Sequence, residues 1–476
     1  MSILKTWLND FSWKRWLPLI VVVKLVVFLY FAFQLKATSP DVLIGGWAAT
    51  TGDTPGYYDP AQHLADGKGY DSACRMPGVI PMYVPLAMIF GEEGAKLCMI
   101  VLQFLLSAIS IYLLGKWAYF IFKKKWVFVI TVLLFALSSF TSIWDHYLMS
   151  DSYSTSFFIF SIYFLQRYQI SHRNKSLLWA GLFLAWAVFF RQIFIVAFPI
   201  VFIILIVWNW KKWSLALASL IVFVFPMVLL LGLWIGYNKK QFNREVVFTT
   251  PIEDCFSTYS KEYQMMTKFL IDMGYGEPFW TDGSVVQWMI RSKENQKMPN
   301  IPDRHFTSQC NADSLVLLRE NFRVYLKSEA PAKDSAAVLL RERITRYSNA
   351  YHSEKKFNYY VLNRLRHAQQ LLVPLRIDNL PGPAFHEMNV FEKIIKIFYL
   401  VLFTVVVIGG MLVMVGLFFT RNNSERWWWM LPLGLVFALT MILGFVEQRY
   451  LVPVYPFMIV AVAFAISRFI KEPEAK

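Results

Sequence analysis

The chain has 476 residues, of which 57% are hydrophobic, 17% aromatic and only 17% charged, and its formal net charge is +15. This composition is typical of a polytopic membrane protein and excludes an ordinary soluble enzyme. In a soluble domain such a charge would suggest nucleic-acid binding, so the positions of the basic residues decide what the charge means.

Apolar segments of about 20 residues can cross the hydrocarbon core of a bilayer. The sequence predicts ten such spans, which form an all-α bundle: 17–35, 96–122, 126–143, 152–167, 176–190, 193–209, 214–236, 391–419, 427–445 and 451–468. No small-residue cleavage site follows the first span, so we expect it to stay in the protein. Lys24 is the one charge well inside a span, and we expect its long side chain to snorkel to the interface.

Basic residues are concentrated on every second connection between these spans. With the N-terminus inside, the inner flanks carry 17 basic and four acidic residues, which accounts for +13 of the net charge of +15. This distribution follows the positive-inside rule for membrane proteins. The charge therefore indicates topology, and we expect no nucleic-acid partner.

The same topology divides the chain into three parts. Residues 1–237 form an N-terminal transmembrane module whose first external loop is 36–95, and residues 391–476 form a C-terminal one. Residues 238–390 form an external helical domain, with helical stretches near 313–328 and 335–372. The outer side can hold at most one disulfide, and we expect Cys255 to pair with Cys310 because both lie in the external domain.

The first external loop reads TTGDTPGYYDPAQHLADGKGY at residues 50–70. Asp59 is a good helix N-cap, Pro60 a good first helical residue, and Gly67 can end the helix, so about two turns fit between them. Residues 77–91 are apolar but too short to span, and two prolines interrupt them. We expect this second short helix to lie along the outer interface.

Ionisable residues occupy the outer ends of several spans. They are Asp53 and Arg75 in the first loop, Asp151 at the start of a span, Arg191 between two spans, and Glu447 and Arg449 before the last span. Charges near lipid are costly unless they share a polar cavity. Arginine binds phosphate through two parallel donors, so a cavity of this kind suits a phosphate on a lipid tail. Taken singly, each residue also fits an interface position or a structural ion pair.

The first external loop resembles that of the GT-C class of membrane glycosyltransferases, which includes the protein O-mannosyltransferases and the lipid A aminoarabinose transferases. The similar residues, in order, are Gly52-Asp53, Tyr57, Ala61, Leu64, Gly67, Gly69, Arg75, Pro77-Gly78 and Pro81. Later marks of the class are similar to Ser150-Asp151, Arg191, Glu447, Arg449-Tyr450 and Pro453. Residues 238–390 show no such resemblance.

The resemblance implies a GT-C-like bundle with juxtamembrane helices in the first external loop. It implies transfer of a sugar from a polyprenyl-phosphate donor to an acceptor hydroxyl, with inversion at the anomeric carbon. Asp53 would be the general base, and Arg75, helped by Arg191 and Arg449, would bind the donor phosphate. Further candidates for binding or orienting substrates are Tyr57, Tyr58, His63, Asp151 and Glu447. The acceptor could be a glycan, a lipid or a protein.

Some members of the class use a divalent metal, which needs several acidic or histidine side chains at one point. Cys74 stands where relatives carry an acid, and the histidines show no ligand spacing. We therefore assign no metal site and leave metal dependence open.

Two other functions fit a polytopic chain: a transporter or flippase of a lipid-linked sugar, and a non-catalytic subunit of a cell-envelope complex. Transporters usually place their charges at mid-membrane depth, whereas these gather at the outer rim. A subunit without activity has no need of Asp53 and the outer arginines. We expect an enzyme of the bacterial inner membrane whose site faces the periplasm.

Overall fold

The computed structural model describes residues 11–250, 260–277, 283–290, 297–373, 383, 385–420, 424–444 and 447–470. Most of these are helical; the others form the antiparallel pair β1 (Leu43–Ile44) and β2 (Ala48–Ala49) or connecting segments. The predicted all-α fold is confirmed. The chain forms two compact units: unit 1 comprises Met1–Thr250, Arg376–Leu435 and Leu451–Lys476, and unit 2 comprises Pro251–Leu375 and Val436–Tyr450.

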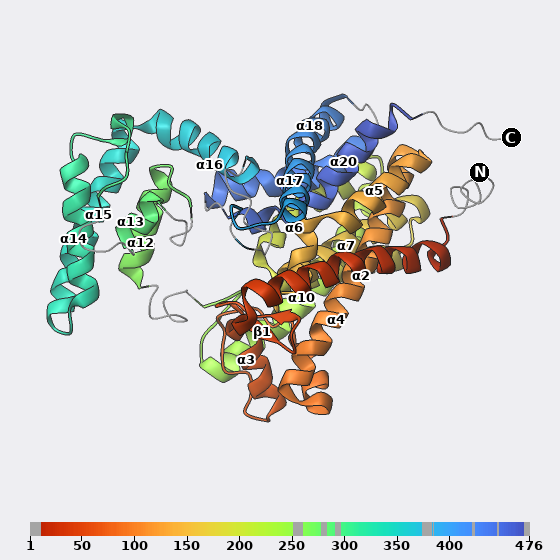
Figure 1. Ribbon diagram of the computed structural model, residues 1–476, viewed down its shortest axis with the longest axis horizontal. Coiled ribbons are helices and arrows are strands. Elements are labelled where there is room, and N and C mark those ends of the chain that lie inside the picture. Colours follow the sequence, from red (N-terminus) through yellow and green to blue (C-terminus); the bar gives the residue numbers. More distant parts are fainter. Residues whose placement is uncertain are drawn as a thin grey trace. The chain divides into compact units, whose positions relative to one another are not determined.

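A helix lies in each of the ten predicted spans (Figure 1). They are α2 (Trp13–Thr38), α4 (Ile80–Phe122), α5 (Lys125–Leu137), α7 (Asp151–Ser171), α8 (Asn174–Phe190), α9 (Ala197–Trp208), α10 (Trp213–Phe242), α17 (Val390–Thr404) with its continuation α18 (Gly410–Thr420), α19 (Met430–Phe437) and α20 (Tyr455–Ser467). In the described ranges, four helices are long and apolar enough to cross a membrane, or five if α5 and its bent continuation count as one span. The protein is an integral membrane protein, and the number of spans stays a prediction.

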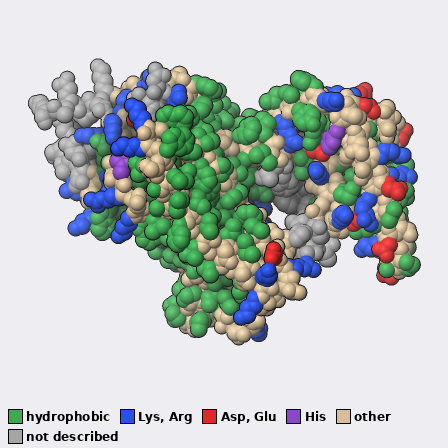
Figure 2. Space-filling view, turned by 180° about the vertical axis from the view of Figure 1, so that it is seen from behind, with side chains coloured by type: hydrophobic (Ala, Val, Ile, Leu, Met, Phe, Trp, Pro, Cys, Tyr) green, Lys and Arg blue, Asp and Glu red, His purple; other side chains and the backbone are tan. Residues whose placement is uncertain are grey.

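Helix α7 is one of the most enclosed helices of unit 1. Of its 21 residues 15 are buried, including the polar Asp151, Ser152 and Ser154 of its first turns, and it packs against α4 and α8. The outer helices instead expose apolar side chains, such as Val26 of α2 and Leu412 of α18. In Figure 2 apolar side chains cover most of the visible face of this unit, and lysines and arginines gather at one end of it. A helix enclosed by protein can therefore keep a polar start that a lipid-facing helix could not.

Two short helices lie within the first external loop, as predicted, but the first begins earlier than expected. It is α3 (Thr54–Ala65), so Asp59 and Pro60 lie inside it and not at its start. Pro55 takes the first turn of the helix, where its missing N–H costs nothing. The second is the part of α4 before Gly91, whose φ of +71° separates it from the following span.

The expected snorkelling of Lys24 is wrong. Its side chain is only 1% exposed, and its Nζ lies 2.5 Å from Oδ2 of Asp145, a residue of the turn before α7. A buried partner removes the reason to reach the interface. The sequence pattern could not reveal this partner, because 121 positions separate the two residues.

Unit 2 contains the helices that the sequence predicts to be external. They are α12 (Lys261–Asp272), α13 (Val285–Ile290), α14 (Ala312–Lys327), α15 (Ala332–Glu354) and α16 (Asn363–Leu372). The first four of these helices share a core that includes Phe269, Trp288, Leu318, Phe322 and Tyr347. Both predicted helical stretches are confirmed, although the second is divided between α15 and α16.

Helices α8 and α10 approach closely at Gly181. A Cβ on Gly181 would overlap the backbone carbonyl oxygen of Phe223 in α10. We expect Gly181→Ala to lower the free energy of unfolding by about 1–3 kcal/mol, because the two backbones must separate. Thermal unfolding of the purified protein in detergent measures this change.

The matched control is Gly232→Ala in α10, where a Cβ would meet no atom within 4 Å. We expect this substitution to be neutral or stabilising by up to about 1 kcal/mol, because alanine favours helix more than glycine does. If Gly181→Ala were as stable as Gly232→Ala, the close packing of α8 on α10 would be refuted.

Candidate active site

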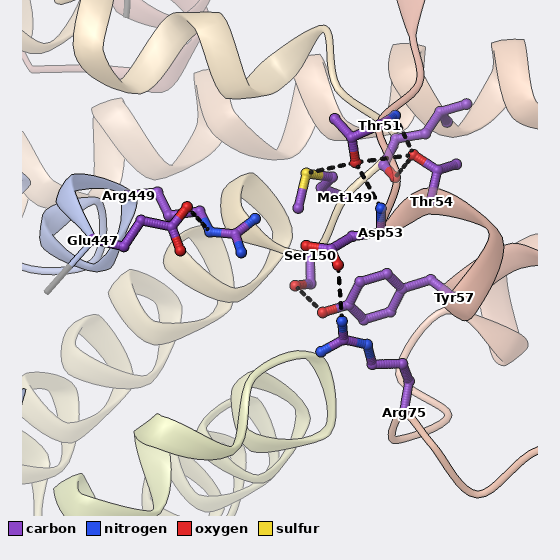
Figure 3. A network of polar contacts seen from close by, with 10 residues as sticks. Thr51, Asp53, Thr54, Tyr57, Arg75, Met149, Ser150, Glu447 and Arg449 are labelled. Atoms are coloured by element: carbon purple, nitrogen blue, oxygen red, sulfur yellow. Dashed lines mark hydrogen bonds and ion pairs between the residues drawn. The ribbon is translucent and has the colours of Figure 1, made fainter. Parts of the chain in front are cut away.

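Asp53 occupies the position before the first residue of α3, yet its carboxylate does not cap the helix. Thr51 and Thr54 stabilise this end instead: the Thr51 N–H donates to Thr54 Oγ1 at 2.8 Å, and the Asp53 N–H donates to Thr51 Oγ1 at 3.2 Å. The Asp53 carboxylate is therefore available to Arg75, whose Nη2 donates to its Oδ1 at 3.0 Å (Figure 3). The loop thus places a carboxylate and a guanidinium side by side.

Tyr57, one turn into α3, positions Arg75. The guanidinium carbon of Arg75 lies 5.0 Å from the centre of the Tyr57 ring, a cation–π contact. The Tyr57 hydroxyl accepts a hydrogen bond from Ser150 Oγ at 3.1 Å. Side-chain exposure of 29% for Arg75 and 31% for Asp53 keeps both groups within reach of a ligand.

The other two candidates on α3 lie apart from this pair. Tyr58 is fully buried with its ring against Tyr83, and burial raises the pKa of its hydroxyl. It has no exposed surface with which to stack on a sugar. His63 lies near the end of α3 and is 40% exposed, with its Nδ1 2.7 Å from Oδ2 of Asp71.

Asp151 and Arg191 form an ion pair inside unit 1. The side chain of Asp151 is completely buried and that of Arg191 is 10% exposed. Arg191 ends α8 and Asp151 begins α7, so the pair fixes one end of each helix to the other. This geometry matches the structural ion pair that the sequence left open.

Glu447 and Arg449 form their own pair within unit 2. Arg449 Nε lies 2.6 Å from Glu447 Oε1, and both side chains are 16% exposed. Arg449 belongs to the short 3-10 helix η9 (Gln448–Leu451) that precedes the last helix. The structure therefore brings Asp53, Tyr57 and Arg75 together in unit 1, and Glu447 with Arg449 in unit 2 (Figure 3).

An apolar pocket of about 280 Å³ is lined by residues on both sides of Arg75 in the sequence, from Leu64 and Tyr70 to Pro77 and Gly78. Its wall includes Pro77 and Gly78 of the loop, Trp186 of α8 and Leu233 of α10. The Trp186 Nε1–H donates to the Gly78 carbonyl at 3.1 Å, and a Cβ on Gly78 would lie 2.6 Å from the backbone oxygen of Phe189. Only glycine allows this close approach, which explains why residue 78 is a glycine.

Cysteine pairing differs from the expectation. Cys310 is a free, buried thiol, so the predicted bond between Cys255 and Cys310 is wrong. Cys74, next to Arg75, is disulfide-bonded, and its partner lies outside the described residues. The loop therefore carries a disulfide bond at the residue before Arg75.

Within the described ranges, no three acidic, histidine or cysteine side chains converge on a point that could hold a metal ion.

Sequence reasoning missed Thr51 and Thr54, and it named Ser150 as a mark of the class without giving it a role. Thr54 Oγ1 also donates to the carbonyl of Leu148 at 3.2 Å, so these hydroxyls join the loop to the turn before α7. The available signal was the spacing of two threonines directly before Pro55, which is typical of local capping.

Comparison with known proteins places these features in context. No curated protein matches the chain in sequence. A solved structure, the archaeal oligosaccharyltransferase AglB from Archaeoglobus fulgidus in complex with an inhibitory peptide and a dolichol-phosphate, is similar at a TM-score of 0.47 and 12% sequence identity. The alignment covers 96% of this chain and 51% of AglB, so the chain spans about half the length of that protein.

A family model described as dolichyl-phosphate-mannose-protein mannosyltransferase matches residues 84–234, which begin within α4 and end within α10. The match confirms, over this part of the chain, the resemblance to the GT-C class of membrane glycosyltransferases.

Proposed function

We propose that the protein transfers a sugar from a polyprenyl-phosphate donor to an acceptor hydroxyl, in a single inverting step. Asp53 takes the proton of the acceptor hydroxyl while its oxygen attacks the anomeric carbon, and the carrier phosphate leaves with the bonding electron pair. Arg75 neutralises the charge that develops on the phosphate. Arg191, which belongs to the same unit as Arg75, remains a secondary candidate for the same task.

The observation that carries this proposal is the pairing of Asp53 with Arg75 in a partly exposed loop. The hydrogen bond between them, 3.0 Å long, engages one of the five N–H donors of the guanidinium. Other N–H donors of the same group can bind a phosphate. Tyr57 and its bond to Ser150 limit the movement of Arg75. A base and an anion-binding group held this close can act on the two ends of one displacement reaction.

The apolar pocket supports a lipid-linked donor. Its lining includes Pro77 and Tyr70, and the Tyr70 hydroxyl donates to the Arg75 carbonyl at 3.3 Å, so a phosphate at Arg75 would have apolar walls near it. Leu233, which lines it, is 64% exposed on the outward side of α10, where lipid is expected. The first isoprene units of a polyprenyl chain fit such a surface.

The comparisons support the same class of substrates. The matched family model names a dolichyl-phosphate-linked sugar and a protein acceptor, and the AglB complex contains a dolichol-phosphate and a peptide. We propose a donor of this class, an acceptor that is a glycan, lipid or protein, and a site on the periplasmic face of a bacterial inner membrane.

Asp53→Asn tests the proposed base. Asparagine keeps the size of the side chain and cannot take up the proton, so we expect turnover to fall about 10²- to 10⁴-fold while donor binding is retained. The measurement is sugar release from polyprenyl-phosphate sugars by the purified protein in detergent.

Asp59→Asn is the matched control, because Asp59 lies on the exposed side of α3 and loses the same charge. We expect its turnover to equal that of the unsubstituted protein. Equal activity of Asp53→Asn, or movement of the carrier across a vesicle without sugar release, would favour the transporter hypothesis.

Leu233→Trp tests the pocket. A larger side chain at its rim displaces part of the carrier chain, and one lost methylene contact is worth about 0.8 kcal/mol. We expect KM for the donor to rise about tenfold or more with kcat little changed. The matched control is Leu217→Trp on the same helix, because Leu217 is 60% exposed and lies outside the pocket lining. We expect it to leave KM unchanged, and a similar rise in both variants would count against the pocket.

A further inference from the structure

Lys24 and Asp145 form a buried ion pair, and the proposed chemistry gives neither residue a role. Both side chains are 1% exposed, and Lys24 Nζ also lies 3.4 Å from Ser142 Oγ. The second carboxylate oxygen of Asp145 accepts a hydrogen bond from Ser152 Oγ at 2.6 Å. The pair thus joins the middle of α2 to the first turn of α7.

The residues that follow Asp145 hold the first external loop. The Ala49 N–H donates to the His146 carbonyl at 2.7 Å, and the Leu148 N–H donates to the Ala49 carbonyl at 2.9 Å. Leu148 and Ser150 then contact Thr54 and Tyr57 through the hydrogen bonds described above. Residues 146–150 therefore support both sides of Asp53 along the chain.

His146 adds a contact back to α2. Its ring stacks on Phe28 with a centroid distance of 3.7 Å, and its Nδ1 lies 3.1 Å from the Trp47 carbonyl. Phe28 is one helical turn after Lys24, so α2 contacts this segment at two successive turns. Helix α2 therefore fixes the position of residues 145–150, and these residues in turn fix the position of the loop.

Stability alone does not account for a buried ion pair. Enclosing two charges costs desolvation free energy, and apolar residues of similar volume are often as stable or more stable. What a buried pair can provide is a single register, because any other register leaves a charge unpaired in an apolar interior.

We propose that Lys24 and Asp145 are positioning residues that set the register of residues 145–152 and so the place of Asp53 and Tyr57. The proposal rests on the function proposed above, since it assigns the pair a role in the same site. Neither residue touches the substrates; both act through the hydrogen bonds of Ser152, Leu148 and Ser150.

The test is the double variant Lys24→Met/Asp145→Leu, which removes both charges and keeps similar volumes. We expect its Tm to stay within a few degrees of the unsubstituted protein, while either single substitution lowers Tm by about 5 °C or more because one charge is left unpaired. We expect kcat of the double variant to fall about tenfold or more with KM for the donor little changed, because misplacement affects the reacting groups and not the tail.

Hydrogen–deuterium exchange provides a reading that does not depend on catalysis. We expect the amides of Ala49 and Leu148 to exchange faster in the double variant than in the unsubstituted protein. The matched control Lys239→Met/Glu245→Gln removes an ion pair of 2.8 Å whose side chains are 65% and 70% exposed. Its kcat and exchange should not change.

Unchanged kcat together with unchanged exchange in the double variant would overturn the proposal. If the double variant does not fold, Lys24→Gln/Asp145→Asn, which keeps hydrogen-bonding groups without charge, is judged by the same two measurements. Absence of sugar transfer by the unsubstituted protein would instead refute the proposed function, and the exchange result would still decide the role of the pair.

Discussion

Hydrogen bonding of the backbone between α6 (Ser139–Ser142) and α7 is the constraint on which the candidate site depends. A break in a helix of a membrane bundle leaves backbone carbonyl groups without hydrogen-bond donors, and other parts of the protein have to supply these donors. Gln103 of α4 donates to the carbonyls of Trp144 and Tyr147 at 2.5 and 3.1 Å. Ala49 of the first loop pairs with the residues on either side of Tyr147. The break is therefore closed by one side chain and one piece of backbone from distant segments.

The first loop depends on this contact in turn. Its two strands are two residues long each, which is far too small for an independent sheet. The order of Asp53 and Tyr57 comes from the threonine bonds around Asp53 and from contacts with residues more than 90 positions later. The disulfide bond of Cys74, the residue before Arg75, anchors the other end of the loop. The pairing of acid and arginine is thus the product of tertiary structure on both sides.

Much of this could be predicted from the sequence. The apolar runs are long enough to identify the helices, and the motif around Asp53 and Arg75 identified two residues that prove to be in contact. What could not be predicted was the choice of partner. Lys24 pairs with Asp145 and Arg191 pairs with Asp151, whereas Cys74, not Cys310, is disulfide-bonded. Burial and tertiary contacts decide these pairings. The early start of α3 was missed for a local reason: two threonine hydroxyls stabilise an end that the nearby Asp-Pro signal obscured.

The enclosure of α7 also bears on how the protein is made. Its first turns carry Asp151, Ser152, Ser154 and Thr155, all of them buried against other helices. A segment with so polar a beginning gains little by entering lipid alone. We therefore expect α7 to enter the bilayer together with α4 and α8, the helices against which it packs.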